Sequence, residues 1–394
     1  PATSGGDGTI GLLDRVVELT QSRVESNVEA AQFYAAALEK RAEMELRHGD
    51  RAAAMHALDD AIACLRRFPR LNGSLAATLG ELLTRKVGFS LQDPRADRKE
   101  LAEAQEEAIH LLRPMDTPLL HLLRAQALSQ SAMLLQGSPL QALAVREQAI
   151  DLLRELAQDR QEAKALLLRL LPDQSAQLLM SGRAGEASER AAEAIRLAGE
   201  LPSDPPIAYL ASLARVNRAD AQVALGRLEG VREMLDEALD SLQKTVLGEL
   251  AALGKLVEAT AHLGLSRIDA MDGRWASSLE HAQHCIDAVQ ALNRSVILPE
   301  IRDQLPDKLE QASILLGGAK RRSEDPARVE EGRRILEAVL AELPEVVAGS
   351  DISAARIASL LHIVAPDLRD SVRKALNGHP ALWQRLELAR PRMP

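Results

Sequence analysis

The segment Gly182-Arg-Ala-Gly-Glu-Ala187-Ser-Glu-Arg-Ala-Ala-Glu-Ala194 contains the pattern from which the architecture can be predicted. A turn glycine is followed by a small residue five positions later, and by another small residue seven positions after that. The same spacing occurs at Gly49/Ala54/Ala61, Gly137/Ala142/Ala149, Gly226/Val231/Ala238 and Gly273/Ser278/Cys285. Such regular recurrence along one chain indicates an internal structural repeat.

Each part of this pattern has a physical explanation. Glycine can end a helix in the left-handed conformation, which other residues resist. The two small residues lie on nearly one face of the next helix, because seven residues make about two turns. Small side chains on that face allow a second helix to approach closely. Each unit is therefore predicted to be an antiparallel helix pair that buries its apolar face by stacking on its neighbours.

The composition supports an all-α chain. Ala, Leu, Glu and Arg dominate, and all four favour helices. Aromatic residues make up only 2%, and no window alternates apolar and polar residues over the length of a strand. Helix starts are predicted at the cap-then-proline pairs Thr117-Pro118, Ser138-Pro139 and Asp325-Pro326, with Gln141 completing a capping box, and at Ser26-Asn27.

The Gly-x4-Ala-x6-Ala pattern, with Gly-Arg-x-x-Glu-Ala at 182–187, resembles the second-helix signature of tetratricopeptide repeats. The resemblance covers roughly 30–345 and implies a right-handed α-solenoid of stacked antiparallel helix pairs with a concave binding groove. Two features depart from the family. Successive motif positions lie 41 to 47 residues apart, whereas the family repeats about every 34, and the consensus aromatics are mostly absent. This long-repeat form resembles kinesin light chains and the sensor arrays of bacterial signalling ATPases.

The expected organisation has three parts. Residues 1–8 are predicted to form a flexible lead, 9–345 the repeat array of about seven helix pairs, and 346–394 the capping helices of the same solenoid. Two units are less regular: 73–113 has no turn glycine, and 300–343 has a proline early in its first helix.

Charge and composition argue against several classes of partner. The net charge is −9 and the arginines are interspersed with glutamates, which disfavours binding to nucleic acid. The basic run Lys320-Arg321-Arg322 is interpreted as a solvated helix end. No apolar run approaches the roughly 20 residues of a membrane span. The two cysteines, Cys64 and Cys285, cannot form a disulfide framework, which favours a reducing, cytoplasmic compartment.

The search for catalytic chemistry gives no candidate set. The segment Gly248–Leu256 resembles a P-loop, but it has one residue too many between its glycines and no Ser or Thr after its lysine. His281, His284 and Cys285 have ligand-type spacing, and His262 on the preceding helix could approach them. Because Cys285 occupies a small-residue position of the repeat, this cluster is interpreted as structural. We therefore expect no catalytic residue, no metal, no cofactor and no enzymatic activity.

A partner would bind on the first helices, which line the groove in the family that the chain resembles. The best match to polar groove chemistry is Arg215-Val-Asn217-Arg218-Ala-Asp220, although an ordinary charged helix face explains it as well. Leu179 and Met180 suggest a surface for an amphipathic helix or an apolar peptide, and core packing is the alternative. A family-type carboxylate clamp has little support, since the corresponding positions are mostly Leu, Ala and Met.

Three functions are then compatible with the sequence. The first is an adaptor that binds a protein or peptide partner in the groove. The alternative is the ligand-sensing or regulatory array of a larger signalling protein, such as a STAND ATPase or a caspase-like protease. A peptide-pheromone receptor is less favoured, because residues 9–25 are too short for the effector domain that usually precedes such an array. The sequence leaves the oligomeric state open.

Overall fold

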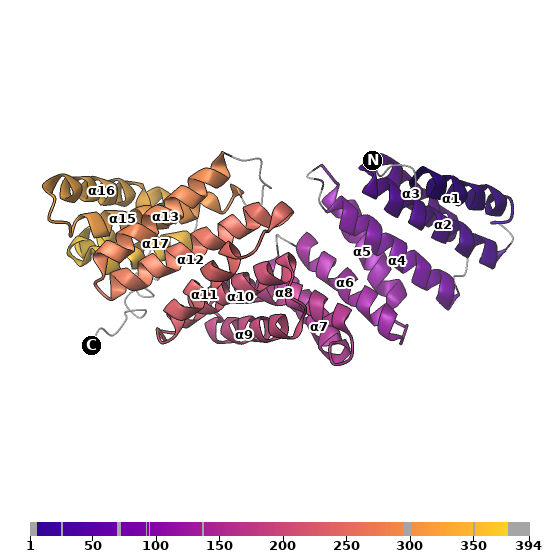
Figure 1. Cartoon of the computed structure of the whole chain (residues 1–394), viewed down its shortest axis with the longest axis horizontal. Coiled ribbons are helices and arrows are strands. Elements are labelled where there is room, and N and C mark those ends of the chain that lie inside the picture. Colours follow the sequence, from indigo (N-terminus) through magenta and orange to yellow (C-terminus); the bar gives the residue numbers. More distant parts are fainter. Residues whose placement is uncertain are drawn as a thin grey trace. The chain divides into compact units, whose positions relative to one another are not determined.

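The computed structural model describes residues 6–24, 27–68, 72–91, 93, 95–135, 138–294, 302–349 and 351–376 (Figure 1). Within these ranges every regular element is a helix and none is a strand, which confirms the all-α prediction. The chain divides into two compact units, Pro1–Leu170 and Leu171–Pro394.

The first unit is built of paired helices. Its elements are α1 (Gly6–Gln21), α2 (Val28–Arg47), α3 (Arg51–Arg66), α4 (Gly73–Ser90), α5 (Arg98–Leu112), α6 (Pro118–Leu134) and α7 (Pro139–Leu156); α8 (Gln161–Met180) crosses the border between the units. Helix α2 packs on α3, α4 on α5 and α6 on α7, while the first helices α2, α4 and α6 also contact one another in sequence. This is the stacking expected of a repeat array.

The second unit repeats the arrangement. Its elements are α9 (Ala184–Glu200), α10 (Pro205–Ala224), α11 (Val231–Gln243), η1 (Gly248–Leu250), α12 (Ala251–Met271), α13 (Trp275–Asn293), α15 (Leu305–Lys320), α16 (Pro326–Gly349), α17 (Asp351–Val364), η2 (Pro366–Leu368) and α18 (Arg369–Ala375). Helix α10 contacts α12, α12 contacts α15, and α15 contacts α17. We call α10, α12, α15 and α17 the first-helix row; α11, α13, α16 and α18 are their second helices.

The turn glycines adopt the predicted conformation. Gly49, Gly182, Gly226 and Gly273 have φ angles between +71° and +84°. At each of them the next residue donates its N–H to a carbonyl five residues earlier, as Arg183 does to Leu178 at 2.9 Å. The glycine N–H in turn bonds three residues back, so each helix ends in a Schellman motif. The fifth motif glycine, Gly137, lies outside the described residues.

The small residues of the motif are buried on the second helices. All are at most 2% exposed: Ala54, Ala61, Ala108, Ala142, Ala149, Ala187, Ala194, Val231, Ala238, Ser278 and Cys285. Ala108 shows that the register continues through the unit without a turn glycine. The predicted repeat is therefore confirmed at the level of side-chain burial.

A buried serine adds a hydrogen bond within two pairs. Ser175 of α8 donates to the carbonyl of Ala187 on α9, and Ser266 of α12 donates to that of Ser278 on α13, both at 2.7 Å. Each serine stands seven residues before its turn glycine. Its hydroxyl thus gives a buried backbone carbonyl of the next helix an additional hydrogen-bond donor.

Helix starts follow the sequence prediction with one exception. The Thr117 side chain accepts from Leu120 N–H, and Asp325 accepts from Ala327 N–H. Asn27 caps α2, while Ser26 lies outside the described residues. The capping box predicted at Ser138 is wrong: Ser138 precedes α7, but its side chain makes no cap hydrogen bond. Helix α1 already includes residues 6–8 of the predicted lead, and residues 1–5 lie outside the described chain.

The run Lys320-Arg321-Arg322 stands at the end of α15, as interpreted from the sequence, but two of its side chains also make specific contacts with other helices. The Arg321 guanidinium pairs with Asp367 at 2.7 Å. The Arg322 guanidinium lies 3.7 Å from the centre of the Trp275 ring and donates to the Val364 carbonyl at 2.6 Å. Through these contacts the two long side chains join helices of the last three pairs. No helix among the described residues is long and apolar enough to cross a bilayer.

Candidate functional site

Two of the predicted partner-binding residues on α10 hold helices together. Arg215 Nε lies 3.0 Å from Glu237 Oε2 on α11. Asn217 Nδ2 donates to the carbonyl of Pro172 at 2.8 Å, joining α10 to α8 beside the proline in that helix. Both side chains therefore already have protein partners within the array.

The other two predicted residues on this helix have a different environment. Arg218 is half-buried, and its Nε finds no hydrogen-bond partner among the described residues. Asp220 is half-buried too, and no hydrogen bond or ion pair joins its carboxylate to a described residue. Burial raises the pKa of Asp220, while Arg267, Lys308 and Arg356 act in the opposite direction.

Asp220 thus belongs to a group of charges spread over the whole first-helix row. Arg267 lies on α12, Lys308 on α15 and Arg356 on α17, and Arg356 Nη1 pairs with Asp307 Oδ2 at 3.3 Å. We call these five residues the charge cluster. Helices that are consecutive in the row bring together residues that are far apart in the sequence.

Two cations of the cluster have no close ion-pair partner in the described part of the chain. Burial lowers the pKa of Arg267 and of Lys308, and Asp220 partly offsets this. Neither cation forms a side-chain hydrogen bond or an ion pair within 4.0 Å in the described part of the chain, and the Arg267 Nε is buried without an acceptor. Partly desolvated charges without partners disfavour the folded state. They are therefore candidates for a binding role.

The sequence contained a signal for this cluster that the spacing argument missed. Asp220 stands six residues before Gly226, and Arg267 stands six residues before Gly273. The same repeat position thus carries opposite charges on neighbouring helices. Lys308 and Arg356 follow no turn-glycine register, so only the packing of α15 and α17 against α12 reveals them.

The predicted apolar residues lie at the end of α8. Leu179 is half-buried, and Met180 is 58% exposed. The turn at Gly182 follows directly. Their exposure leaves side-chain surface for a partner, and a contribution of this turn to binding stays a prediction.

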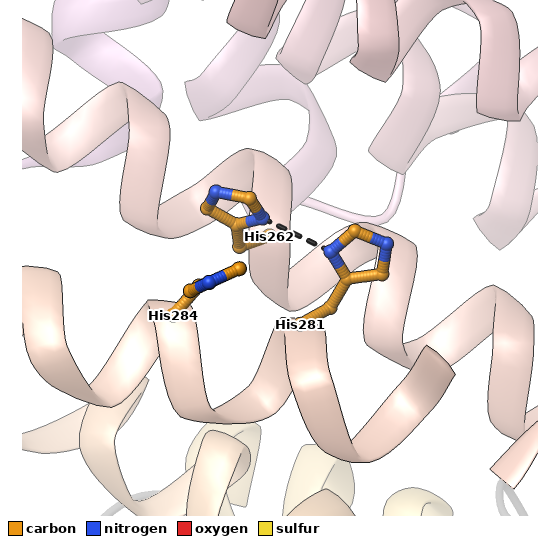
Figure 2. Close-up of side chains that lie close together, drawn as sticks. All are labelled: His262, His281 and His284. Atoms are coloured by element: carbon orange, nitrogen blue, oxygen red, sulfur yellow. Dashed lines mark hydrogen bonds between the residues drawn. The ribbon is translucent and has the colours of Figure 1, made fainter. Parts of the chain in front are cut away.

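Three histidines form a second group, on α12 and α13 (Figure 2). His262 Nδ1 lies 3.1 Å from His281 Nδ1, and the ring centres of His262 and His284 are 4.9 Å apart. Cys285 does not join them: it is fully buried in the core around α13 and α15, and burial raises the pKa of its thiol to about 12. Its interpretation as a packing residue is confirmed.

Comparison with known proteins finds solved structures that have a similar fold. No family model matches the chain, and no curated protein matches it in sequence. The crystal structure of apo RapI is similar, with a TM-score of 0.53 and 12% identity over 95% of this chain and 98% of RapI. The fold is tetratricopeptide-like. A Rap protein complexed with competence and sporulation factor matches at TM-score 0.47 (12% identity, 98% and 99% covered). The nuclear import adaptor Nro1 matches at 0.40 (16% identity, 75% and 98% covered).

Proposed function

We propose that this tetratricopeptide-like chain is a non-catalytic scaffold that binds a protein or peptide partner on the first-helix row of its second unit. The observation that carries the proposal is the charge cluster of Asp220, Arg267, Asp307, Lys308 and Arg356. Many charged side chains of this chain pair within it, as Arg215 does with Glu237. Arg267 and Lys308 have no such partner among the described residues.

The chemistry of the cluster favours a partner segment that carries carboxylates. Three cations face two carboxylates, and one of these, Asp307, already pairs with Arg356. A carboxylate placed near Arg267 and Lys308 would accept charge-assisted hydrogen bonds that no described group provides. The scaffold therefore suits an acidic stretch of a protein or peptide, with Met180 as an additional apolar contact.

The location of the protein is part of the same proposal. Cys64 and Cys285 are both free thiols, and both are buried. Thiols of this kind suit a reducing compartment, so we place the scaffold in the cytoplasm. A net charge of −9 makes a nucleic acid or an anionic membrane surface a poor partner for the molecule as a whole.

Peptide binding can be tested with fluorescence anisotropy on three labelled peptides of equal length, one acidic, one neutral and one basic. The acidic peptide should bind most tightly. Arg267→Gln and Lys308→Gln should each weaken that binding by roughly 30-fold, because removing one member of a buried charge pair costs about 2 kcal/mol or more.

The matched control is Arg333→Gln on α16. Arg333 is an exposed arginine that pairs with Glu330 and Glu337 on its own helix, so the substitution removes the same charge elsewhere. The Arg333→Gln variant should bind the acidic peptide with the same affinity as the wild type. Equal binding of all three peptides, or an equal loss in the Arg333 variant, would contradict the proposal.

A further inference from the structure

We propose that His262, His281 and His284 form a binding site for one zinc ion or a similar divalent transition-metal ion. One ligating atom from each of the three residues lies within 4.8 Å of the other two. His262 comes from α12, and the other two come from successive turns of α13. Figure 2 shows the three rings gathered between these two helices.

The distance between two of the three histidines is close to that of a metal site. Two nitrogens bound to a tetrahedral zinc at 2.0–2.1 Å are about 3.3 Å apart. The Nδ1 atoms of His262 and His281 are 3.1 Å apart. The His284 ring centre lies 4.9 Å from that of His262, and its plane is tilted by 50°. For His284 to become the third ligand, its ring would have to move closer to the other two.

The antiparallel packing of α12 on α13 fixes this geometry. His281 and His284 are three residues apart and therefore lie on one face of α13. His262 stands eleven residues before Gly273, so the turn brings it opposite that face. The buried hydrogen bond from Ser266 to Ser278 locks the register of the two helices one turn away from the histidines. The imidazoles are thus held by the core of the repeat rather than by a loop.

A buried carboxylate lies near one of the ligands. His281 Nε2 lies 3.8 Å from Asp269 Oδ2. Asp269 is fully buried and is held by Arg274 at 2.8 Å and by Ser277 at 2.6 Å, besides Arg232. An N–H on Nε2 that faces this carboxylate leaves the Nδ1 lone pair directed at His262. In known metal sites a carboxylate that accepts the other ring N–H sets the tautomer of the histidine, and Asp269 lies on the side where it would do so.

The surroundings of His262 and His281 favour the neutral form that a metal binds. Burial, helped by the other two histidines and by Lys255, lowers the pKa of His262 to about 4. Burial also lowers the pKa of His281. Neutral imidazoles offer lone pairs without a proton that the metal must displace.

The ligand set indicates which ions would bind. Three imidazoles suit zinc, cobalt, nickel or copper, whereas calcium and magnesium prefer oxygen ligands. His284 is exposed to solvent, so a fourth position is open to water or to a side chain of a bound partner. Lys255 is a nearby cation, but it pairs with Glu258 at 2.9 Å, which moderates its repulsion of a metal.

Metal binding is tested on the full chain without an affinity tag. Calorimetric titration with zinc should give one ion per chain, and cobalt should produce the visible absorption of a tetrahedral histidine complex. His284→Ala and His262→Gln should each weaken zinc binding by at least about tenfold. Even the loss of a residue that only hydrogen-bonds to a metal ligand has an effect of about this size. His284→Ala is the decisive variant, because His284 is exposed and removing its side chain leaves the core intact.

His56→Ala is the matched control, since His56 is an exposed histidine on α3, where it contacts Asp60. It should bind zinc as the wild type does and give the same cobalt spectrum. The proposal is overturned if the wild type takes up no stoichiometric zinc. It is equally overturned if His284→Ala binds with unchanged affinity, or if His56→Ala loses as much. These experiments measure metal binding and not peptide affinity. A negative result would therefore overturn the metal site without contradicting the proposed scaffold function.

Discussion

The turn glycines allow a sharp test, because one helix pair contains two glycines with opposite requirements. Gly182 has a φ angle of +77°, while Gly185 lies three residues later in the first turn of α9. A Cβ atom added at either position meets nothing within 4 Å. The substitutions Gly182→Ala and Gly185→Ala therefore add the same atom without a clash, and only the backbone conformation differs.

The two substitutions should change the free energy of unfolding in opposite directions relative to the wild type. Alanine at Gly182 must adopt a left-handed conformation, which destabilises the folded state by about 1–2 kcal/mol. Alanine at Gly185 replaces glycine within a helix, where it is more stable by about 0.5–1 kcal/mol. The two variants should therefore differ by roughly 1.5–3 kcal/mol in free energy of unfolding.

Urea unfolding followed by circular dichroism measures the two midpoints against the wild type. Since repeat arrays do not always unfold as one cooperative unit, hydrogen exchange of α8 and α9 gives the local free energy of opening. Protection of the buried amides in this pair should fall for Gly182→Ala and rise for Gly185→Ala. Changes of the same sign and size in both variants would refute the assignment of Gly182 as an obligatory left-handed cap.

Three further predictions concern the second unit. Ser266→Ala should lower the free energy of unfolding by about 1 kcal/mol, because the Ser278 carbonyl loses its buried donor; an unchanged urea midpoint would contradict this. Arg322→Gln should cost about 1–2 kcal/mol, because the guanidinium no longer stacks on Trp275; the thermal midpoint and Trp fluorescence report the loss. Lys308→Met should raise the thermal midpoint while weakening peptide binding, because it removes a desolvated cation that has no ion-pair partner within 4.0 Å among the described residues; a lower midpoint with full binding would show that the cation is structural.

Much of the fold could be predicted because the repeat uses residues with strict geometric requirements. A left-handed helix end favours glycine, and a close helix contact favours a small side chain. Gly226 and Ala238 therefore reveal a helix pair from sequence alone, and the structure has both in the expected state. The Ser138 capping box failed because a Ser-Pro pair fixes a helix start through the proline, whether or not the serine side chain bonds to the backbone.

The candidate site was less accessible to prediction. Arg215 and Asn217 have the chemistry of a binding surface, but their partners on α11 and α8 cannot be found from local spacing. Lys308 reaches the charge cluster only because α15 packs on α12. The histidines show the same limit: His281 and His284 are visible as a spaced pair, whereas their alignment with His262 depends on the register of two antiparallel helices.

The position six residues before each turn glycine accepts many residue types, unlike the glycine and the small residues of the motif. This position is occupied by Glu43, Ser131, Ala176, Asp220 and Arg267 in the five pairs that share the motif. A site that accepts an acid, a hydroxyl, a methyl and a guanidinium is not constrained by helix packing, whereas the glycine and the small residues beside it are. Fold stability constrains the glycine and the small residues. The variable position can therefore contact a partner without disturbing the fold. Asp220 and Arg267 occupy this free position on adjacent helices, which is why we locate partner recognition in the second unit.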